Sequence, residues 1–430
     1  MKQPPIVEFR DDREARLYHG RSGWRAYLVA LPVVAAIAGV AFLGVTGPKG
    51  TPSDTARPSA RSTPTPLWTA APTPGPIDVP GLSTIQVSDS ETVTAALPPD
   101  TLPLDADGGN FLYATAGRLY VLAWGQTPQT PIQVATARPC AQIDKASLSG
   151  TDVIYSQIVP AGDAPGGRGT CPSLADAVNW YVSITNFSGV GRLVASGTSA
   201  GQPPDGVAAS TPDVAIADAM YAFSRTDSSG TSTVVEVHRL IDDSLQYKSV
   251  ALALPVQVRL GDGRLVVVSP GPAPVDGLAG TTSVLSTDDW TQPLVPFGLT
   301  AGPAALSRDG RRLAFSSCEP DGDKLKCDLL ETFVPGIHRS RQLPIAATFV
   351  CAGSGPESDL AAVAWTSYAA GGSPYIGVDS ALGDKGVALV GMDQPMWISL
   401  QGDALLWLSL APDGSAALHR LDLLSVISAT

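Results

Sequence analysis

A short strand pattern that returns seven times is the feature that most limits how this chain can fold. Each copy is an apolar or aromatic run that ends in Ser or Thr. The terminal hydroxyl residues are Thr115, Ser156, Ser224, Ser269, Ser316, Thr366 and Ser409. They lie 41, 68, 45, 47, 50 and 43 residues apart, and a second run rich in β-branched and aromatic residues follows each one. A period of about 40–50 residues with several short strands per unit is typical of a propeller blade.

The repeat predicts an all-β fold. A helical repeat of similar period needs apolar residues every 3.6 positions, which these runs lack. Seven matched units also argue against a β-sandwich with accidental spacing. We therefore predict a β-propeller with seven four-stranded blades, with six or eight blades as the alternatives. Because the ring must close, residues 83–88 are predicted to supply the outer strand of the last blade, near residues 396–430.

The turn that opens one repeat has a recognisable form. The segment LSRDGRRLAFS, residues 306–316, places an Asp-Gly turn before its strand, and GDGRLVVVS, residues 261–269, keeps that turn. This pattern resembles the repeat of TolB-like propellers and, more loosely, WD-repeat propellers, over residues 81–430. The match is partial in the other units. The resemblance implies a propeller that binds other proteins, often outside the cytoplasm, and it brings no catalytic residues.

An uncharged apolar stretch near the start of the chain predicts a membrane anchor. Residues 26–47 contain no charged side chain, and a bilayer core needs about twenty apolar residues in a helix. A cleaved signal peptide is the alternative, but it has a shorter apolar core and a small-residue cleavage site. Arginines at 13, 16, 21 and 25 crowd the N-terminal flank. The positive-inside rule then places residues 1–25 in the cytoplasm as a short tail.

A linker is predicted between the anchor and the propeller. Residues 48–80 hold nine prolines among many Thr and Ser. Such a segment has little to bury and is stiffened by proline, so we expect it to be disordered and extended. The propeller domain, residues 81–430, would then lie outside the cytoplasm at the cell membrane. All five cysteines follow the predicted anchor, which fits an oxidising compartment where disulfides persist.

Two disulfides are predicted from the cysteine positions. Cys318 and Cys327 are symmetric about Gly322-Asp323, and a two-residue turn there would place them opposite each other at a non-hydrogen-bonded pair, within disulfide range. Such a bridge would hold an exposed hairpin rigid. Cys140 and Cys171 form the second candidate pair. This arrangement leaves Cys351 free, although five cysteines allow others.

The loops between the second and third strands of each unit vary most in length, and in a four-stranded blade they emerge on one face of the disc. The longest spans residues 157–178. Loop length varies where a scaffold presents function, so we predict that this face, the loop face, binds a partner. Its candidate binding residues are Asp163, Arg168, Asp276, Asp321, Asp323, Lys324 and Tyr368.

Several other kinds of site are not indicated. A formal net charge of -12 and a pI near 4.7 argue against nucleic-acid binding. The four histidines are scattered and predict no metal cluster. The segment DADGGN at residues 105–110 starts like a calcium loop, but no glutamate completes it, so we interpret it as a turn. We predict no catalytic residue, cofactor or metal.

These patterns favour one function class and leave two alternatives. The first hypothesis is a membrane-tethered extracytoplasmic propeller that binds a protein or a cell-envelope component through its loop face. A propeller-type glycosidase or lactonase would need convergent carboxylates or metal ligands in the central channel, and Asp, Glu and His do not recur at one strand position. A transmembrane sensor is the other alternative. Neither the partner nor the oligomeric state is indicated by the sequence.

Overall fold

The structure is a computed structural model, and it describes residues 79, 81–87, 92–124, 130–160, 177–200, 211–229, 232–253, 256–270, 282–300, 304–321, 324–333, 337–341, 350–353, 362–369, 373–380, 386–410 and 415–427. They belong to one compact unit, Pro76–Ala273 with Thr281–Thr430. The predicted tail and membrane helix, residues 1–47, lie outside the described residues, as does the predicted linker except Val79. In the described ranges, no helix is both long and apolar enough to span a bilayer.

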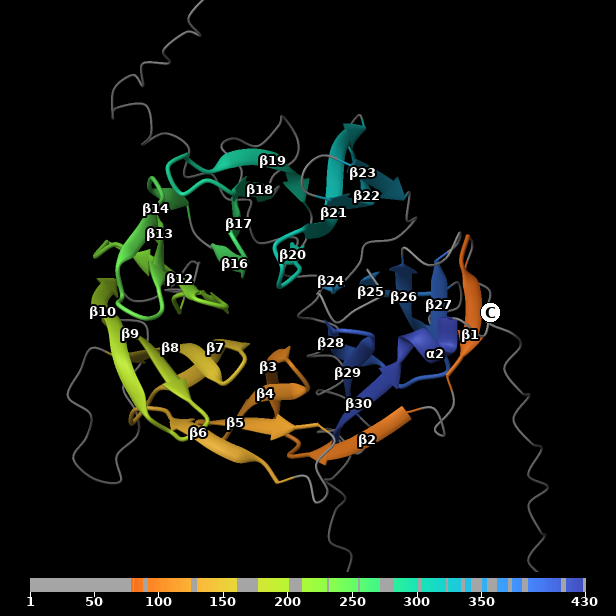
Figure 1. The fold of residues 1–430 in the computed structure, drawn as a ribbon, viewed down its shortest axis with the longest axis horizontal. Helices are drawn as coiled ribbons and strands as arrows, with labels where there is room; N and C mark the ends of the chain where they lie inside the picture. Colours follow the sequence, from red (N-terminus) through yellow and green to blue (C-terminus); the bar gives the residue numbers. More distant parts are fainter. Residues whose placement is uncertain are drawn as a thin grey trace, which may run out of the picture. The chain divides into compact units, whose positions relative to one another are not determined.

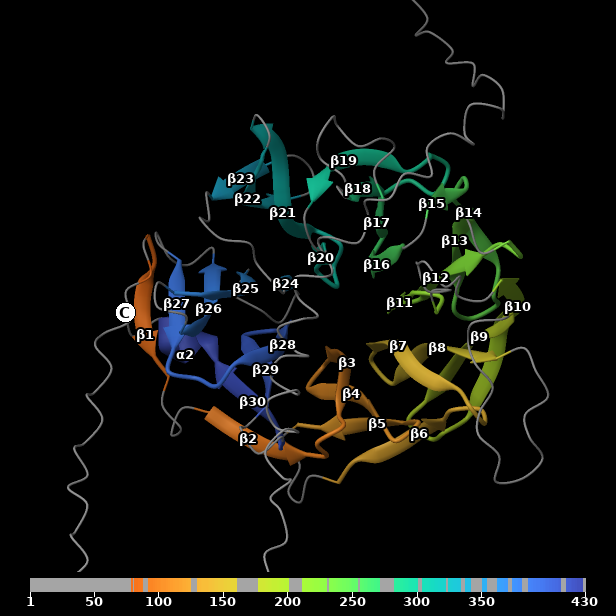
Figure 2. The same cartoon turned by 180° about the vertical axis from the view of Figure 1, so that it is seen from behind.

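The described chain is a β-propeller. Its strands hydrogen-bond into six sheets. Figures 1 and 2 show the sheets arranged around a central axis, with strands such as β3, β7 and β28 innermost. The all-β class and the propeller architecture are therefore confirmed. The described helix, α2 (Leu423–Ile427), follows the last strand.

Three sheets have the simple blade order, in which consecutive strands pair outward from the axis. The first contains β3 (Leu102–Asp107), β4 (Asn110–Thr115), β5 (Arg118–Ala123) and β6 (Ile132–Thr136). The second contains β7 (Gln142–Ser149), β8 (Asp152–Pro160), β9 (Ala177–Asn186) and β10 (Gly191–Ala200). The third contains β11 (Val214–Ala217), β12 (Met220–Thr226), β13 (Ser232–Arg239), β14 (Leu245–Lys248) and β15 (Leu252–Ala253), which pairs with β13.

The fourth sheet has eight strands, and it changes the blade count. Its members are β16 (Gln257–Gly261), β17 (Arg264–Pro270), β18 (Thr282–Thr287), β19 (Val295–Thr300), β20 (Ala305–Leu306), β21 (Arg312–Asp321), β22 (Lys324–Phe333) and β23 (Ile337–Arg341). It holds the fourth and fifth sequence repeats, joined through one pair, Thr300 with Ser317. Counted as hydrogen-bonded sheets, the propeller has six blades. The predicted seven was wrong because two repeats share one sheet.

The two remaining sheets take their outermost strands from the start of the domain. One contains β24 (Val350–Gly353), β25 (Ala362–Tyr368), β26 (Pro374–Ser380), β27 (Val387–Val390) and β1 (Ser83–Gln86). The other contains β28 (Pro395–Gln401), β29 (Ala404–Leu410), β30 (Ala416–Asp422) and β2 (Thr92–Leu97). The last sheet is thus completed from the N-terminal side, as predicted, but by a different segment.

The closing strand is β2, which pairs antiparallel with β30, whereas β1 pairs in parallel with β27 of the preceding sheet. The prediction that residues 83–88 close the last sheet was therefore wrong. The side chains explain the choice. Ala95 and Leu97 of β2 are buried in the cluster between the last sheet and the first, but β1 has no fully buried side chain to place there.

The core lies between neighbouring sheets, where strand side chains pack face to face. One such cluster joins Phe111 and Tyr113 of the first sheet to Leu406 and Leu418 of the last. The repeated hydroxyl residues belong to this buried framework rather than to a site. All except Thr115 are buried, and Ser224 Oγ accepts a hydrogen bond of 2.7 Å from the backbone N–H of Asp213.

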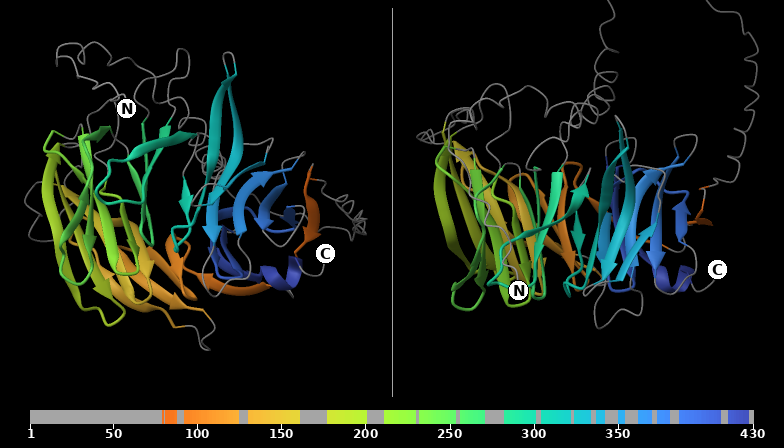
Figure 3. Two further views of the ribbon diagram at one scale, coloured as in Figure 1. Left: turned by 45° about the horizontal axis from the view of Figure 1, so that its top comes forward. Right: turned by 90° about the horizontal axis from the view of Figure 1, so that it is seen from above.

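The β21–β22 hairpin stands out beyond the ends of the neighbouring strands (Figure 3). Its register places Cys318 opposite Cys327 and Asp321 opposite Lys324, as the predicted turn requires; the turn residues themselves lie outside the described chain. Cys140 and Cys318 are each disulfide-bonded. The side chains of the other cysteines are not described, so the pairings Cys318–Cys327 and Cys140–Cys171, with Cys351 free, stay predictions.

Candidate functional site

The innermost strands enclose a cavity of about 470 Å³ along the propeller axis. Its wall is made by residues of β3, β7, β11, β16, β20 and β28 and of the turn that follows β20. Ligand pockets commonly measure about 300–1,000 Å³. This channel cavity is the candidate site, and its two ends differ. We call the end formed by the turns between first and second strands the turn end.

The Asp-Gly turn recognised in the sequence helps to build the turn end. Ser307 Oγ donates to Asp309 Oδ1 at 2.6 Å, which fixes the turn locally. Gly310 has a φ of +66°, and a Cβ there would lie 2.4 Å from the carbonyl oxygen of Asp262. Glycine is needed for both reasons. The close packing lets Asp262 N donate to Arg308 O at 2.8 Å, and so it places Arg308 at the channel.

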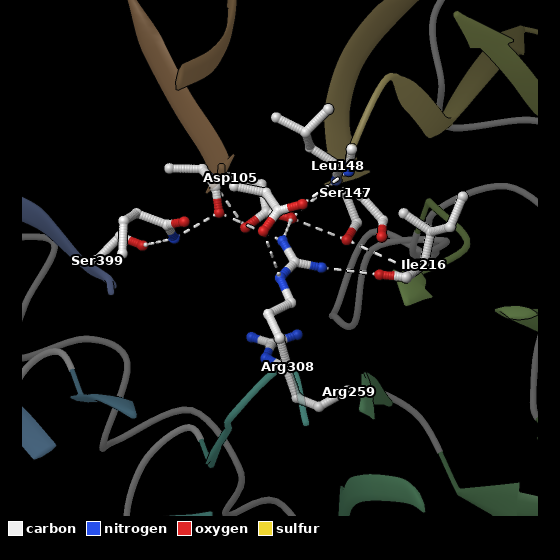
Figure 4. Close-up of polar contacts among 12 residues, drawn as sticks. Asp105, Ser147, Leu148, Ile216, Arg259, Arg308 and Ser399 are labelled. Atoms are coloured by element: carbon white, nitrogen blue, oxygen red, sulfur yellow. Dashed lines mark hydrogen bonds and ion pairs between the residues drawn. The ribbon is translucent and has the colours of Figure 1, made fainter. Parts of the chain in front are cut away.

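Arg308 reaches across the channel, as Figure 4 shows. Its Nη2 donates to Asp105 Oδ2 at 2.7 Å, and its Nη1 donates to the carbonyl oxygen of Ile216 at 2.8 Å. Its Nε lies 3.9 Å from Asp107 Oδ1. One side chain of the eight-stranded sheet therefore ties together the first and third sheets.

Asp105 also accepts hydrogen bonds from the second sheet. Its Oδ2 also accepts hydrogen bonds from Ser147 Oγ and from the backbone N–H of Leu148, both at 2.8 Å. Gln401 of the last sheet donates to the carbonyl oxygen of Ala106 at 2.5 Å. These bonds and those of Arg308 form a network, which we call the Arg308 network, that crosses the turn end of the channel.

The charges at the turn end hold the guanidinium protonated. Burial lowers the pKa of Arg308, but Asp105, Asp107 and Asp218 raise it, and the pKa lies above its ordinary value. For Asp218, on the β11–β12 turn, the surroundings disfavour the charged form instead. Partial loss of hydration and the nearby carboxylates of Asp262 and Asp107 raise the pKa of Asp218, while Arg308 lowers it. The turn end is thus an acidic rim around a charged arginine.

The other end of the cavity lies at the loop face. Each innermost strand runs toward the turn end, so the second strand of each sheet returns to the opposite face. In the second sheet, Asp152 pairs with Ser149 beside the turn, and β8 ends at Pro160, after which residues 161–176 follow. The cavity reaches the start of the inner strands, at Leu102 of β3 for example. The cavity mouth and the predicted binding loops therefore share one face.

Three innermost strands carry a β-bulge just before a residue that lines the cavity. The register shifts before Asp105 in β3, before Lys145 in β7 and before Trp397 in β28. A bulge changes the direction of the side chains that follow it, and bulges are common beside active sites. The local sequence does not reveal them, because each depends on the pairing with the next strand.

Two further cations line the cavity wall. Lys145 is exposed, and no ion pair involves it among the described side chains. Arg259 Nη1 donates to the carbonyl oxygen of Val258 at 2.8 Å and lies 3.5 Å from Asp213 Oδ2. That same Oδ2 accepts the backbone N–H of Val258 at 2.6 Å, so the Asp213 charge is shared. Of the charged side chains on the wall, three are cationic and two are acidic, in a chain with a net charge of -12.

The wall offers no assembled acid–base pair. Asp105 is bound by Arg308 and by two further donors, and Asp213 is bound by Arg259 and a backbone amide. Among the described residues, no group of three or more His, Cys, Asp or Glu could hold a metal ion. The arrangement suits binding through charge and shape.

The predicted loop-face residues are only partly described. Tyr368 ends β25, is 43% exposed, and its hydroxyl accepts a hydrogen bond of 2.7 Å from Gln394 Nε2. Asp321 and Lys324 face each other in the hairpin register, but their side chains are not described. The remaining four lie outside the described residues: Asp163, Arg168, Asp276 and Asp323. That these seven residues form one binding surface stays a prediction.

Sequence reasoning missed the residues of the cavity itself. Residues 105–110 were interpreted as a turn, but only Gly108 and Gly109 form it, and Asp105 lies in β3. Its partner Arg308 lies 203 residues away along the chain, and no local pattern connects the two. Lys145 and Arg259 were not singled out at all. The one available signal was the Asp-Gly turn at residues 309–310, since Arg308 directly precedes it.

Several solved propeller structures are similar to this chain at a low level. The β-propeller domain of the Trilobed protease from Pyrococcus furiosus, which has an open velcro topology, is 10% identical with a TM-score of 0.43, and the match covers 63% of this chain and 79% of that one. TolB from Acinetobacter baumannii is 10% identical with a TM-score of 0.35, covering 77% and 64%. YCF48 bound to D1 peptide is 11% identical with a TM-score of 0.44, covering 79% and 99%.

These neighbours include a protease domain and proteins of other kinds, so they do not decide whether this chain is an enzyme. No family model matches the chain, and no curated protein matches it. Its function has to be argued from its own site.

Proposed function

We propose that this protein is a membrane-tethered, extracytoplasmic propeller that binds a protein or a cell-envelope component through its loop face and the cavity mouth. The observation that carries this proposal is the asymmetry of the channel. The Arg308 network crosses the turn end, and the cavity extends from there to the face where the long loops emerge. A partner on the loop face would contact both the long loops and the cavity mouth.

Binding is favoured over catalysis by the state of the channel carboxylates. A glycosidase needs two carboxyl groups free to act on opposite sides of a bond. Asp105 and Asp213 are instead engaged by arginines and backbone amides. A channel hydrolase therefore ranks behind a binding module, and a transmembrane sensor stays the other alternative.

The proposed location rests on residues 26–47 and on the cysteines. Disulfides persist outside the cytoplasm, and Cys318 lies opposite Cys327 in the hairpin. We expect non-reducing peptide mapping of the full chain from its own membranes to recover a Cys318–Cys327 cross-linked peptide. Recovery of both as free thiols in freshly alkylated cells would contradict an extracytoplasmic propeller.

Crosslinking in membranes tests the binding role. The full chain would be compared with a variant that carries Asp163→Asn, Arg168→Gln and Asp276→Asn on the loop face. The control variant carries Arg239→Gln and Asp242→Asn, an exposed ion pair at the turn after β13, which runs away from the loop face. We expect the loop-face variant to lose partners, identified by mass spectrometry, that the control retains. Equal recovery of partners by the two variants would contradict the loop-face proposal.

A further inference from the structure

Lys145 and Arg259 reach the cavity from the sheets on either side of β11. Asp213, just before β11, is the acidic residue between them, and it already accepts a backbone N–H and lies 3.5 Å from Arg259. For Arg259, the hydrogen bonds seen among the described residues use Nη1. Its Nε and Nη2, together with the Lys145 ammonium, remain available as donors to a bound anion.

The rest of the cavity wall limits which kind of molecule can carry the anion into the cavity. Trp397 lines the cavity opposite the cations in the ring order and packs edge-on against Phe111 with ring centroids 5.4 Å apart. The Arg308 network crosses the far end, so an extended chain would not pass through it. A group that enters from the loop face must end inside the cavity, as a side chain or a chain terminus does.

Charge favours an anionic group, such as a carboxylate, over a neutral one. Cationic side chains outnumber acidic ones on the wall, whereas the chain as a whole carries a net charge of -12. Most of its surface therefore repels anions, and a bound carboxylate has to be drawn by a local cationic site. Arginine and lysine bind carboxylates through charge-assisted hydrogen bonds, which are stronger than neutral ones.

We propose that Lys145 and Arg259 bind a carboxylate inside the channel cavity, and that an acidic segment of the partner supplies it from the loop face. This inference rests on the proposed function for the identity of the partner, and it adds the chemistry by which the partner is recognised. The bulge before Lys145 directs this side chain to the cavity wall, and the backbone of β16 places Arg259.

A peptide titration of the purified full chain tests the proposal without any partner. The probes are a fluorescent oligoglutamate peptide and a matched oligoglutamine peptide, followed by fluorescence anisotropy. We expect the oligoglutamate peptide to bind more tightly, and its affinity to fall as salt is added, because salt screens exposed charges. Equal affinity of the two peptides would overturn the proposal.

Variants locate the binding site. Lys145→Gln with Arg259→Gln should weaken oligoglutamate binding about tenfold or more, since each removes a charged hydrogen-bond donor. The control, Arg118→Gln with Arg311→Gln, makes the same charge change at two exposed arginines outside the cavity wall and should stay within about twofold. If the control weakens binding as much as the cavity variant does, general surface charge explains the binding and the cavity assignment is wrong.

Single variants separate a loss of binding from a loss of folding. Lys145 is exposed and forms no ion pair among the described side chains, so Lys145→Gln should fold normally and still weaken binding, whereas Lys145→Arg should retain it. Unchanged binding by a folded Lys145→Gln protein would count against the site. Succinate distinguishes the source of the carboxylate: poor competition by succinate points to an acidic segment, and displacement of the peptide at equal concentration points to a free small carboxylate in the same site.

Discussion

Single glycines decide how closely strands and turns approach one another in this propeller. A Cβ on Gly377 of β26 would lie 2.1 Å from the Trp365 indole, and one on Gly197 of β10 would lie 2.4 Å from the Trp180 indole. Trp365 and Trp180 are almost fully buried. In each case, the glycine pairs with the tryptophan of the adjoining strand and leaves room for its ring, so the small residue belongs to the packing of the core.

We expect Gly377→Ala to destabilise the protein by about 1–3 kcal/mol, because it overpacks a rigid indole site. Chemical denaturation of purified protein measures the change. Trp365→Phe is destabilising alone but frees space, so the double variant should lose less stability than the sum of the two single variants. Strict additivity would show that the two side chains do not meet.

Asp218 gives a prediction with a defined pH dependence. Its folded-state pKa is raised, first by partial loss of hydration and then by Asp262 and Asp107, so its charged form costs stability at neutral pH. Asp218 has a φ of 47°. Asn, like Asp, tolerates this left-handed conformation, so Asp218→Asn should not strain the turn. We expect the variant to gain a few tenths of a kcal/mol at neutral pH.

The sign of this effect follows from proton linkage. A carboxyl whose pKa is raised on folding binds its proton more tightly in the folded state, so its penalty is absent below the unfolded pKa and appears as pH rises through the folded value. The stability gained by Asp218→Asn should therefore shrink as pH falls toward about 3.9, the ordinary Asp value. A gain that is the same at acidic and neutral pH would contradict this account.

At the scale of elements, the strands were predictable and their partners were less so. The alternation and turn signals placed β4, β8, β12, β17 and their successors correctly, since each signal is local. The closing strand was assigned to residues 83–88 instead of β2, because the choice depends on burial of Ala95 and Leu97 against distant strands. The blade count failed for a similar reason, since the Thr300–Ser317 pair joins two repeats.

The closing role of β2 can be tested within one strand. Ala95 is buried and Val93 is 51% exposed on the same strand. Ala95→Asp should destabilise the protein by about 2 kcal/mol or more, because it buries an unpaired charge between the last sheet and the first. Val93→Asp is the matched control and should change the unfolding free energy by less than about 0.5 kcal/mol. Similar losses for both would mean that β2 does not close the ring.

At the scale of the whole molecule, the Arg308 network links sheets that are far apart along the chain. Arg308 joins the first, third and eight-stranded sheets, and Gln401 adds the last one. Apart from the Asp-Gly turn beside Arg308, the contacts of this network do not follow from local sequence patterns, because they exist only once the ring has closed. The fold class could be predicted from repeats, whereas the site could not.

We expect Arg308→Met to destabilise the protein by about 1–3 kcal/mol, because Asp105 loses a charged hydrogen-bond partner while staying partly buried. Asp105→Asn should cost less when Arg308 is already Met, since the two act on one interaction. Thermal unfolding of the four proteins gives the coupling energy. A coupling energy near zero would show that the ion pair does not hold the turn end together.

The central claim is that the partner meets this propeller at the loop face and the cavity mouth. Photo-crosslinking from single positions of the full chain in its own membranes tests it most directly. A photoreactive residue at Tyr368, which ends β25 at the loop face, is compared with one at Thr151, which is exposed on the β7–β8 turn at the opposite end. We predict partner adducts from position 368 and none from position 151; adducts from position 151 alone would contradict the account.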